Sequence, residues 1–539
     1  MKIRKLLLFI IIAVMMLLVA CSDEDAAGET NEEESKKNLD NVNESGFPIV
    51  DEQIKLDFFA GTSATTNASD WNDILIWNTY KEMSNVDVNW NTVTPDALEE
   101  KRNLALASGD LPDVFYAAQL PVTDVYKYGE QGVFIPLNDL IEEHAPNLQK
   151  LLEEYPDIKK ALTFPDGNVY SFPYIFSPEF TSLRVGSMLW INKEWVDTLG
   201  MEMPETTEEY YQYLKAVKTE DPNGNGEADE IPYGGHVIDH LTQSLYGSFG
   251  IGNKGGGWID EDPETGDVRL HAITDGYKQM LEYLHKLYSE GLIEQNIFSI
   301  EHSQYLANGA EGKYGSTVFY TPPQLFGEAG ENFESTIALK GPNGDQMFSK
   351  VTHPLATMGG FSITNVNENP VATVKWMDYF YSNEGAKLYY MGVEGETYEE
   401  TEDGPVYMDH ITDSAEGLTR EQEMTKYLTW VGVSAPGIIR QEYFGGSESS
   451  PEAVAAGEKI EPYIVDELWS NFTYTAEENK VLNSVGTDIE KYLAEMRDKF
   501  ITGDAPLSEW DNYVETIKQM GLDEYLEVQQ AAMERYRSE

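Results

Sequence analysis

The chain has 539 residues, of which 41% are hydrophobic and 12% aromatic, a composition typical of folded globular domains. It carries 37 Lys and Arg against 94 Asp and Glu, and the resulting net charge of −57 repels the phosphates of nucleic acid. The length allows about two to four domains, and the charge argues against nucleic acid as a partner.

The N-terminus has the pattern of a signal peptide over residues 1–20. Three basic residues precede an apolar run over residues 6–20, which is shorter than a membrane span of about 20 residues. The run ends in LVAC, which resembles a bacterial lipobox, so we expect cleavage before Cys21 and attachment of acyl chains such as palmitate to its sulfur. The alternative is a chance cysteine after an ordinary signal peptide. Because Cys21 is the only cysteine, an intramolecular disulfide, a thiolate metal cluster and a catalytic cysteine are ruled out.

Residues 21–46 are polar and acidic, so they are expected to form a flexible tether, with the folded body beginning near Phe47. Hydrophobic patterns then predict alternating strands and helices: strands over 54–61, 86–93 and 114–117, and helices over 70–83 and from Pro95 or Asp96 to Gly109. Strand, helix, strand, helix, strand indicates parallel α/β organisation.

The rest of the body continues this mixed pattern. Residues 166–176 are predicted to form a hairpin-like turn that leads into a strand, and residues 187–200 a strand followed by a helix. Further helices are predicted over 206–218, 275–291 and 369–392, and the C-terminal third is expected to be largely helical. The helix at 206 begins with a capping box, Thr206 with Glu209.

The stretch DPNGNGEADEIP at residues 221–232 begins like a calcium-binding loop. Such a loop has oxygen ligands at positions 1, 3, 5 and 9 and glutamate at position 12, but position 12 here is Pro232. A loop that closes early supplies about six oxygens, from the side chains of Asp221, Asn223, Asn225, Asp229 and Glu230 and from the carbonyl of Glu227. This all-oxygen set favours a structural calcium ion over zinc. The alternative is a polar turn, to which Gly224 and Gly226 are suited.

No other motif supports catalysis. His236 and His240 lie one helical turn apart, but a zinc protease needs glutamate beside the first histidine, where this chain has Val237. No nucleophile elbow, Walker loop or dinucleotide fingerprint occurs. Glycoside hydrolysis needs only two carboxylates, so an enzymatic function remains an alternative, although no motif in the sequence supports it.

Aromatic residues in polar loops are candidate ligand contacts. Most of the 10 Trp and 32 Tyr should lie in the core. Rings flanked by polar residues suit stacking on the apolar face of a sugar, and this criterion selects Trp71, Tyr116, Tyr174, Tyr320 and Trp430.

Several longer stretches occur in a characteristic order. They are LASGDLPDVFYA (106–117), GVFIPLNDLIEEHAPNL (132–148), DGNVYSFPY (166–174), residues 189–218, GVEGETYE (392–399) and the closing stretch 500–530. Together they resemble the extracellular solute-binding proteins of ABC importers (family 1), of the large oligosaccharide-binding kind that includes alginate-binding proteins. The resemblance spans nearly the whole mature chain.

The resemblance implies an α/β, two-lobed periplasmic-binding-protein-like fold (type II), with a ligand cleft between the lobes, hinge closure and a helix-rich C-terminal third. We expect one lobe from 47–170 plus about 300–370, and the other from 171–299 plus about 371–539. Some members carry a calcium loop that DPNGNGEADE matches, which implies the six ligands named above. At position 227 the related loops commonly have lysine, whereas this chain has Glu227. The expected ligand from this position is the backbone carbonyl, so the substitution does not remove it.

The expected function is that of a monomeric, lipid-anchored receptor on the extracellular face of the cell membrane. It would capture an oligosaccharide, such as a plant or algal polysaccharide fragment, and deliver it to the permease subunits of an ABC transporter without bond chemistry. The alternatives are a peptide-binding receptor of the same fold and a secreted polysaccharide-active enzyme.

Overall fold

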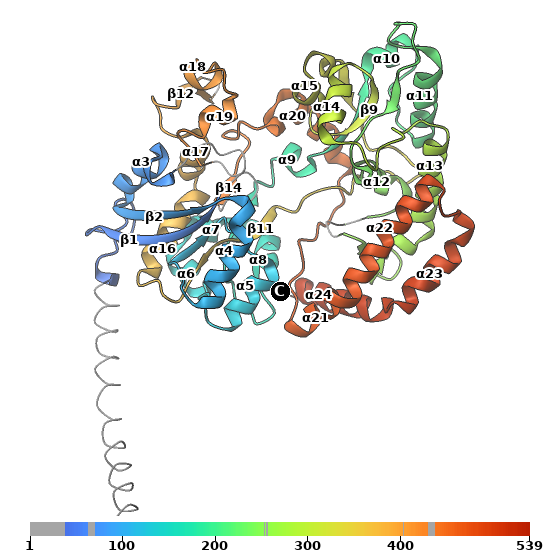
Figure 1. Cartoon of the computed structure of the whole chain (residues 1–539). Helices are drawn as coiled ribbons and strands as arrows, with labels where there is room; N and C mark the ends of the chain where they lie inside the picture. The colour runs from blue at the N-terminus through green and yellow to red at the C-terminus, as the bar shows by residue number, and fades with distance from the viewer. Residues whose placement is uncertain are drawn as a thin grey trace, which may run out of the picture.

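The structure, a computed structural model, describes residues 38–62, 70–252, 254, 257–402, 404–429 and 437–538 of the chain. This part forms two lobes, each built on its own β-sheet and joined by segments that run between them (Figure 1). The expected α/β class and two-lobed architecture are confirmed. The signal peptide and Cys21 lie outside the described residues.

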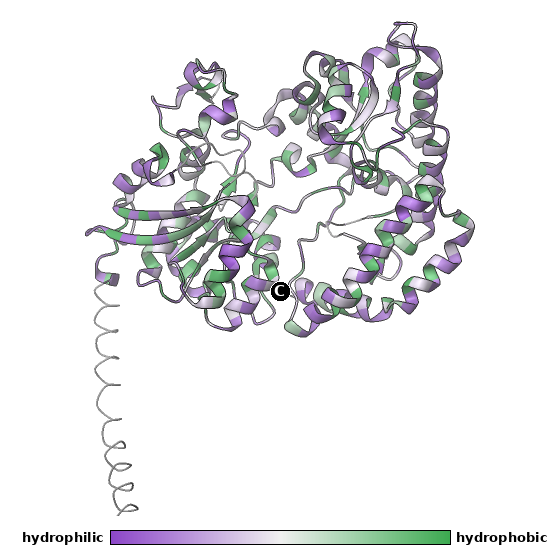
Figure 2. Cartoon of the chain, viewed as in Figure 1, coloured by the Kyte–Doolittle hydropathy of each residue, from purple (hydrophilic) through white to green (hydrophobic). Residues whose placement is uncertain are grey.

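The first lobe is built on a six-stranded sheet in the order β14-β4-β11-β3-β1-β2. Its strands are β1 (Ile54–Gly61), β2 (Val86–Val93), β3 (Val114–Tyr116), β4 (Phe172–Phe176), β11 (Leu355–Ile363) and β14 (Gly437–Ile439). β1 pairs in parallel with β2 and β3, whereas β11 lies antiparallel between β3 and β4. The parallel unit predicted for the N-terminal part is confirmed. β2, at the edge, alternates hydrophobic and polar residues (Figure 2).

Helices of the first lobe follow the boundary signals of the sequence. α4 begins at Pro95, whose fixed φ suits a first helical position, and ends before Gly109, which takes the left-handed conformation at φ 76°. The other helices of this lobe are α3 (Leu75–Ser84), α5 (Val122–Glu130), α6 (Asn138–His144), α7 (Pro146–Glu154), α8 (Pro156–Leu162), α16 (Pro370–Asp378), α17 (Asn383–Met391), α18 (Asp409–Thr412) and α19 (Arg420–Met424).

The second lobe is built on a four-stranded sheet in the order β10-β5-β9-β6. Its strands are β5 (Met188–Asn192), β6 (Ile231–Tyr233), β9 (Tyr314–Phe319) and β10 (Phe333–Ser335), and its helices include α10 (Lys193–Thr198), α11 (Thr207–Glu220), α12 (Ile238–Leu245), α13 (Asp275–Ser289), α14 (His302–Ala310) and α15 (Pro322–Phe326). The predicted capping box of α11 is present in full, with Thr206 and Glu209 bonding each other's backbone N–H groups.

Three crossing segments join the lobes. The first (residues 177–187) leads from β4 through α9 (Thr181–Val185) to β5, and the second (residues 336–354) leads from β10 to β11. The third (residues 440–475) follows β14 and contains α20 (Pro451–Ile460), which packs against α9. The first two run side by side, since the Thr352 N–H donates to the Arg184 carbonyl at 2.8 Å.

Strand pairing corrects the expected division of the chain. Residues 300–370 are split between the sheets, because β9 and β10 pair with β5 whereas β11 pairs with β3 and β4. Residues 371–439 return to the first lobe, where the Tyr80 hydroxyl donates to the Trp376 carbonyl at 2.8 Å and β14 pairs with β4. The expected boundaries failed because these partners are far apart in the sequence, and local patterns do not report which sheet a strand joins.

The C-terminal region after the third crossing segment is helical, as predicted. It comprises α21 (Ala476–Val481), α22 (Thr487–Thr502), α23 (Trp510–Gln519) and α24 (Leu522–Ser538), with α22 packed on α13 of the second lobe. Hydrophilic and hydrophobic residues alternate around these helices (Figure 2), as expected for helices that cover a core. None of the described helices is both long enough and apolar enough to cross a membrane.

Candidate functional site

A cleft of about 540 Å³ lies where the three crossing segments meet the lobes. This volume is within the range of about 300–1,000 Å³ that is typical of small-molecule sites. The lining includes Leu183 to Ser187 of the first crossing segment, Ser349 to His353 of the second and Glu448, Trp469, Ser470 and Asn471 of the third, together with Phe176, Gln243, Gly257, Tyr320, Leu355, Ala356 and Thr357. A ligand here would contact both lobes.

The cleft has an exposed aromatic ring. Tyr320 follows β9 and is 39% exposed, although its neighbour Phe319 packs against it with ring centroids 4.7 Å apart. Partial burial, with a smaller effect of the Glu448 carboxylate, raises the pKa of Tyr320, so the hydroxyl stays neutral. A tyrosine in this position offers an apolar face for stacking and a hydroxyl for hydrogen bonding.

Basic side chains line the crossing-segment side of the cleft. Arg184 donates to the Thr352 carbonyl at 3.3 Å and to the Pro178 carbonyl at 2.9 Å, so it ties the first two crossing segments together. Burial lowers the pKa of Lys350 to about 8, an effect that the nearby Asp239 carboxylate partly opposes. The cleft thus carries a partly buried ammonium group that is still mostly charged at neutral pH.

His353 is neutral in the wall of the cleft. Its Nδ1 accepts a hydrogen bond from the Leu355 N–H at 3.0 Å, which places the ring proton on Nε2. Burial, with repulsion from the Arg184 guanidinium, lowers the pKa of His353 to about 4. His353 therefore adds a neutral hydrogen-bond donor to the site.

A charge network anchors the segment that carries Trp469. Glu467 accepts from the Lys254 ammonium at 2.8 Å and from the Arg537 guanidinium at 2.6 Å, and both cations also bond Glu261. Burial would raise the pKa of Glu467, but the hydrogen bonds from Arg537 and Lys254 outweigh burial and lower it to about 2. The last helix, α24, thereby holds one wall of the cleft in place.

Three of the sequence-selected aromatic residues lie in the core of the first lobe instead of the cleft. Trp71 and Tyr174 are 0% exposed and Tyr116 is 1% exposed. The Trp71 and Tyr116 ring centroids are 6.2 Å apart, and the Tyr174 hydroxyl is 2.9 Å from that of Tyr390. Their selection as ligand contacts is therefore corrected. Their polar neighbours in sequence gave no information on how deeply the sheet buries the rings.

The other two selected residues have different outcomes. Tyr320 lines the cleft, as described above. Trp430 lies outside the described residues. Sequence reasoning missed Arg184, Lys350 and Trp469, although Trp469 lies in the polar stretch DELWSNF and meets the criterion that selected Tyr320. For the two cations no local pattern gave a signal.

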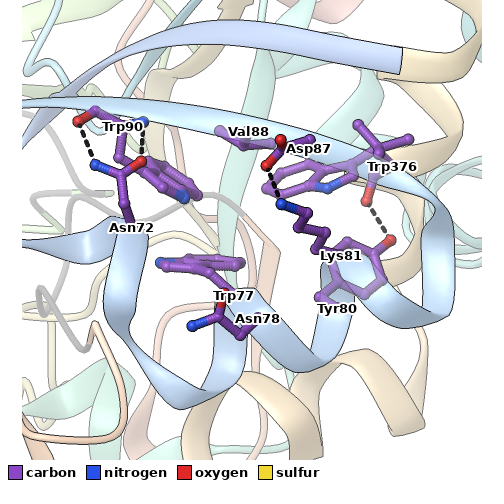
Figure 3. A pocket seen from close by; sticks show the side chains of 10 residues that line it. Asn72, Trp77, Asn78, Tyr80, Lys81, Asp87, Val88, Trp90 and Trp376 are labelled. Atoms are coloured by element: carbon purple, nitrogen blue, oxygen red, sulfur yellow. Dashed lines mark hydrogen bonds and ion pairs between the residues drawn. The ribbon is translucent and has the colours of Figure 1, made fainter. Parts of the chain in front are cut away.

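A second, smaller pocket of about 150 Å³ lies within the first lobe, between α3 and β2 (Figure 3). The Trp77 and Trp90 rings lie 4.6 Å apart, and Lys81 forms an ion pair of 2.8 Å with Asp87. The Asn72 side chain bonds both backbone groups of Trp90. Because its charged side chains, Lys81 and Asp87, pair with each other and its indoles are almost fully buried, this pocket belongs to the aromatic core rather than to a ligand site.

The loop at residues 221–230 connects α11 to β6, as the sequence predicted. Asp221 adopts the left-handed conformation at φ 45°, and its carboxylate accepts from the Gly226 N–H at 3.0 Å. The Asp229 carboxylate accepts from Asn225 at 2.9 Å and from Asn223 at 3.3 Å. These four oxygen-bearing side chains, Asp221, Asn223, Asn225 and Asp229, are therefore gathered on one side of a tight loop.

Glu230 adds a carboxylate to this loop, one oxygen of which has no hydrogen-bond partner among the described residues. This oxygen, Oε1, is buried. Burial, with repulsion from Asp221 and Asp229, raises the pKa of Glu230. An orphaned carboxylate oxygen facing two other carboxylates fits a site for a hard cation. In the described part of the chain no group of three or more His, Cys, Asp or Glu side chains is placed to hold a metal, and this loop relies partly on asparagine and a backbone carbonyl.

Three histidines of the second lobe, His236, His240 and His302, form a packed cluster. The His236 ring centroid lies 5.4 Å from that of His240 and 4.6 Å from that of His302. Burial, with repulsion from Lys350 and His236, lowers the pKa of His240 to about 3. His240 therefore packs as a neutral ring in this cluster.

Two sheets joined by crossing segments around a cleft define a two-lobed binding protein. The sequence profile described as bacterial extracellular solute-binding protein matches residues 65–387. The chain belongs to this family, as its sequence motifs suggested. Among curated relatives, the fructooligosaccharide ABC transporter substrate-binding protein FusA of Streptococcus pneumoniae is 30% identical over 497 residues, which cover 89% of this chain and 90% of FusA.

Solved structures agree with this assignment. S. pneumoniae FusA in complex with kestose superposes with a TM-score of 0.70 at 28% identity and covers 90% of this chain and 100% of that chain. A FusA EF-hand mutant in complex with fructo-nystose gives the same values. A human-milk-oligosaccharide-binding protein from Bifidobacterium longum infantis has a TM-score of 0.76 at 22% identity, covering 90% of this chain and 99% of that chain, and supports the fold alone.

Proposed function

We propose that this protein captures an oligosaccharide in the cleft between its lobes and presents it to the permease of an ABC importer. The observation that carries the proposal is the cleft itself, built by the three crossing segments, with the exposed ring of Tyr320 among polar side chains. An aromatic face among hydrogen-bonding groups suits a sugar, which has an apolar ring face and peripheral hydroxyls. The fructooligosaccharide receptor FusA, which spans most of this chain, supports the same class of ligand.

The mechanism requires binding without bond chemistry. A ligand that contacts both lobes is held more tightly when the lobes are closed, so it shifts the population toward the closed state. The crossing segments are where such a hinge motion would be absorbed. A permease could then distinguish the closed, loaded form from the empty form.

We also propose that the loop at residues 221–230 holds a structural calcium ion. The ligands would be the side chains of Asp221, Asn223, Asn225, Asp229 and Glu230 and the carbonyl of Glu227. The gathered oxygens and the orphaned Glu230 carboxylate support this assignment, as does the description of a FusA variant as an EF-hand mutant. Bound calcium would neutralise the carboxylates and fix the turn between α11 and β6.

The lipobox-like sequence at Cys21 supports a membrane anchor, and strand pairing supports a division of the chain into two lobes. Lipidation of Cys21 would anchor a monomer to the outer face of the membrane through the acidic tether, in keeping with an extracellular family. We assign β1 to β4, β11 and β14 to the first lobe, and β5, β6, β9, β10 and the C-terminal helices to the second, because each set shares a sheet or packs on its lobe.

Isothermal titration of the protein against a panel of oligosaccharides that includes kestose and nystose tests the proposal. We expect at least one sugar to bind with a measurable heat. Binding of a peptide but no sugar would change the ligand class to that of a peptide receptor. Release of shorter products from a polysaccharide incubated with the protein would show an enzyme instead.

A further inference from the structure

The cleft has an excess of positive charge, in contrast to the acidic chain as a whole. Acidic residues outnumber basic ones in the chain, 94 against 37. The lining reverses this balance, with the cations Arg184 and Lys350 against the single carboxylate Glu448. A local excess of positive charge in so acidic a protein calls for a specific explanation.

Lys350 is the cation of the cleft without a partner. No hydrogen bond or ion pair formed within the described residues involves its ammonium group, whereas the partly buried Lys254 pairs with two carboxylates. The Asp239 carboxylate, which acts electrostatically on Lys350, pairs with Arg497. Glu448, the carboxylate in the lining, accepts from the Ser447 hydroxyl at 2.9 Å. A partly buried cation that the fold leaves unpaired is available to a ligand.

Two further donors that line the cleft also lack partners. Ser349, next to Lys350 in the chain, is 2% exposed, and Trp469 is 1% exposed. Neither the Ser349 hydroxyl nor the Trp469 indole N–H bonds any of the described residues. His353 contributes its Nε2–H, because Nδ1 is used by the backbone. Buried donors are normally satisfied, so this group of donors fits a ligand that is rich in acceptors.

We infer that the cleft recognises an acidic sugar, with a ligand carboxylate bound by the Lys350 ammonium and the neighbouring donors Ser349 and Trp469. This inference rests on the proposed function, because it assumes an oligosaccharide in the cleft. A carboxylate has only acceptor oxygens when ionised, and charge-assisted bonds to an ammonium are stronger than bonds between neutral groups. Tyr320, in the same cleft, would stack on the ring of the same sugar or its neighbour.

The net charge of the protein does not oppose this assignment at physiological ionic strength. Interactions between exposed charges are largely screened beyond about 8 Å under these conditions. The lining therefore decides the local preference, whereas the surface charge lowers the rate of encounter with an anion at low salt.

The inference carries a dependence on pH. The pKa of Lys350 is about 8, so affinity for an acid falls as the pH rises above that value and the ammonium loses its proton. The other charged or titratable groups near it are Asp239 and His240 on α12 and Arg184, His353 and Glu448 in the cleft. His240 and His353 are already neutral over this range, with pKa values of about 3 and about 4.

The test uses pairs of ligands that differ only in charge. Oligogalacturonate and its methyl ester have the same sugar backbone, and kestose is a neutral reference. We expect the acid to bind at least about tenfold more tightly than the ester. Lys350→Met should remove this preference, because the acid loses a charge-assisted bond and therefore more affinity than the ester does. Lys350→Arg should keep the preference and remove its loss above about pH 8, because guanidinium stays charged.

The matched control is Lys55→Met, which removes an equal charge from an exposed position on β1. Melting temperatures show that each variant is folded. Equal affinity for acid and ester, an equal effect of Lys350→Met on both, or binding of kestose with no acid bound would overturn the acidic-sugar assignment and leave the oligosaccharide function intact. Absence of binding across the whole sugar panel would instead contradict the proposed function.

Discussion

Tyr320 lines the cleft, is 39% exposed and directly follows the strand β9, which ends at Phe319. Phe319 packs against the Tyr320 ring, and the part of the ring that remains exposed is available to a ligand in the cleft. This residue therefore offers a direct test of ligand stacking.

Replacing Tyr320 with alanine should weaken oligosaccharide binding by about tenfold or more, because the stacking face and the hydroxyl are both lost. Titration calorimetry measures the change. Phe298→Ala is the matched control, since Phe298 is an aromatic residue with a similar exposure of 38% outside the cleft. Equal effects of the two variants would show that Tyr320 does not contact the ligand.

Trp71 illustrates the opposite case, an aromatic residue next to a polar segment that belongs to the core. Its ring packs against Trp90 at 5.3 Å and against Tyr116 at 6.2 Å. We expect Trp71→Ala to lower the free energy of unfolding by about 3–5 kcal/mol through the cavity it creates, as measured by urea denaturation. Trp71→Phe should cost less. If Trp71→Ala leaves the stability unchanged but weakens sugar binding, Trp71 is a ligand contact and not a core residue.

At the scale of elements, the loop at residues 221–230 joins α11 to β6 through a tight turn. If it binds calcium, the ion stabilises only the folded state, so chelation should lower the melting temperature. Asp221→Ala should abolish that sensitivity, whereas Asp110→Ala, at an exposed position of the first lobe, should retain it. A melting temperature unaffected by chelation in the unmodified protein would argue that the loop is a metal-free turn.

The anchoring of the third crossing segment by α24 depends on pH. The pKa of Glu467 falls from 4.5 to about 2 on folding, so its ion pairs stabilise the protein above pH 4.5 and are lost as the pH falls toward 2. Glu467→Gln cannot titrate, so its melting temperature should lie below that of the unmodified protein at neutral pH, and the gap should narrow over this acidic range.

Glu458→Gln serves as the control for this gap, because Glu458 is an exposed residue of α20 in the same crossing segment. It should melt like the unmodified protein at every pH. If the difference in melting temperature between Glu467→Gln and the unmodified protein stays constant as the pH falls toward 2, the charge of Glu467 does not contribute to stability.

At the scale of the whole molecule, the cleft contacts both lobes, and the chain crosses between them three times. A ligand that bridges the lobes should favour closure. Small-angle X-ray scattering should therefore show a smaller radius of gyration with saturating oligosaccharide than without it. Tyr320→Ala should need a higher ligand concentration for the same decrease. A radius that does not change on binding would indicate a rigid receptor.

The sequence by itself determined the local features of this protein. The limits of α4, the capping box of α11, the parallel N-terminal strands and the helical C-terminal region all follow from residues that are close together in the chain. The family motifs and the calcium-type loop were also readable, because the chemistry of each depends on a short, continuous stretch. Tyr320 was found because a ring in a polar loop is a local signal.

Only the tertiary structure decided how these parts combine. It assigned β9 to the second sheet and β11 to the first, and it buried Trp71, Tyr116 and Tyr174 while leaving Tyr320 at the cleft. It also brought Arg184, Lys350 and Trp469 together from three crossing segments that are distant in the sequence. Burial and unpaired charge depend on which surfaces meet in space. Because the chain crosses between the lobes three times, consecutive strands can belong to different sheets, so the local sequence does not show which surfaces meet.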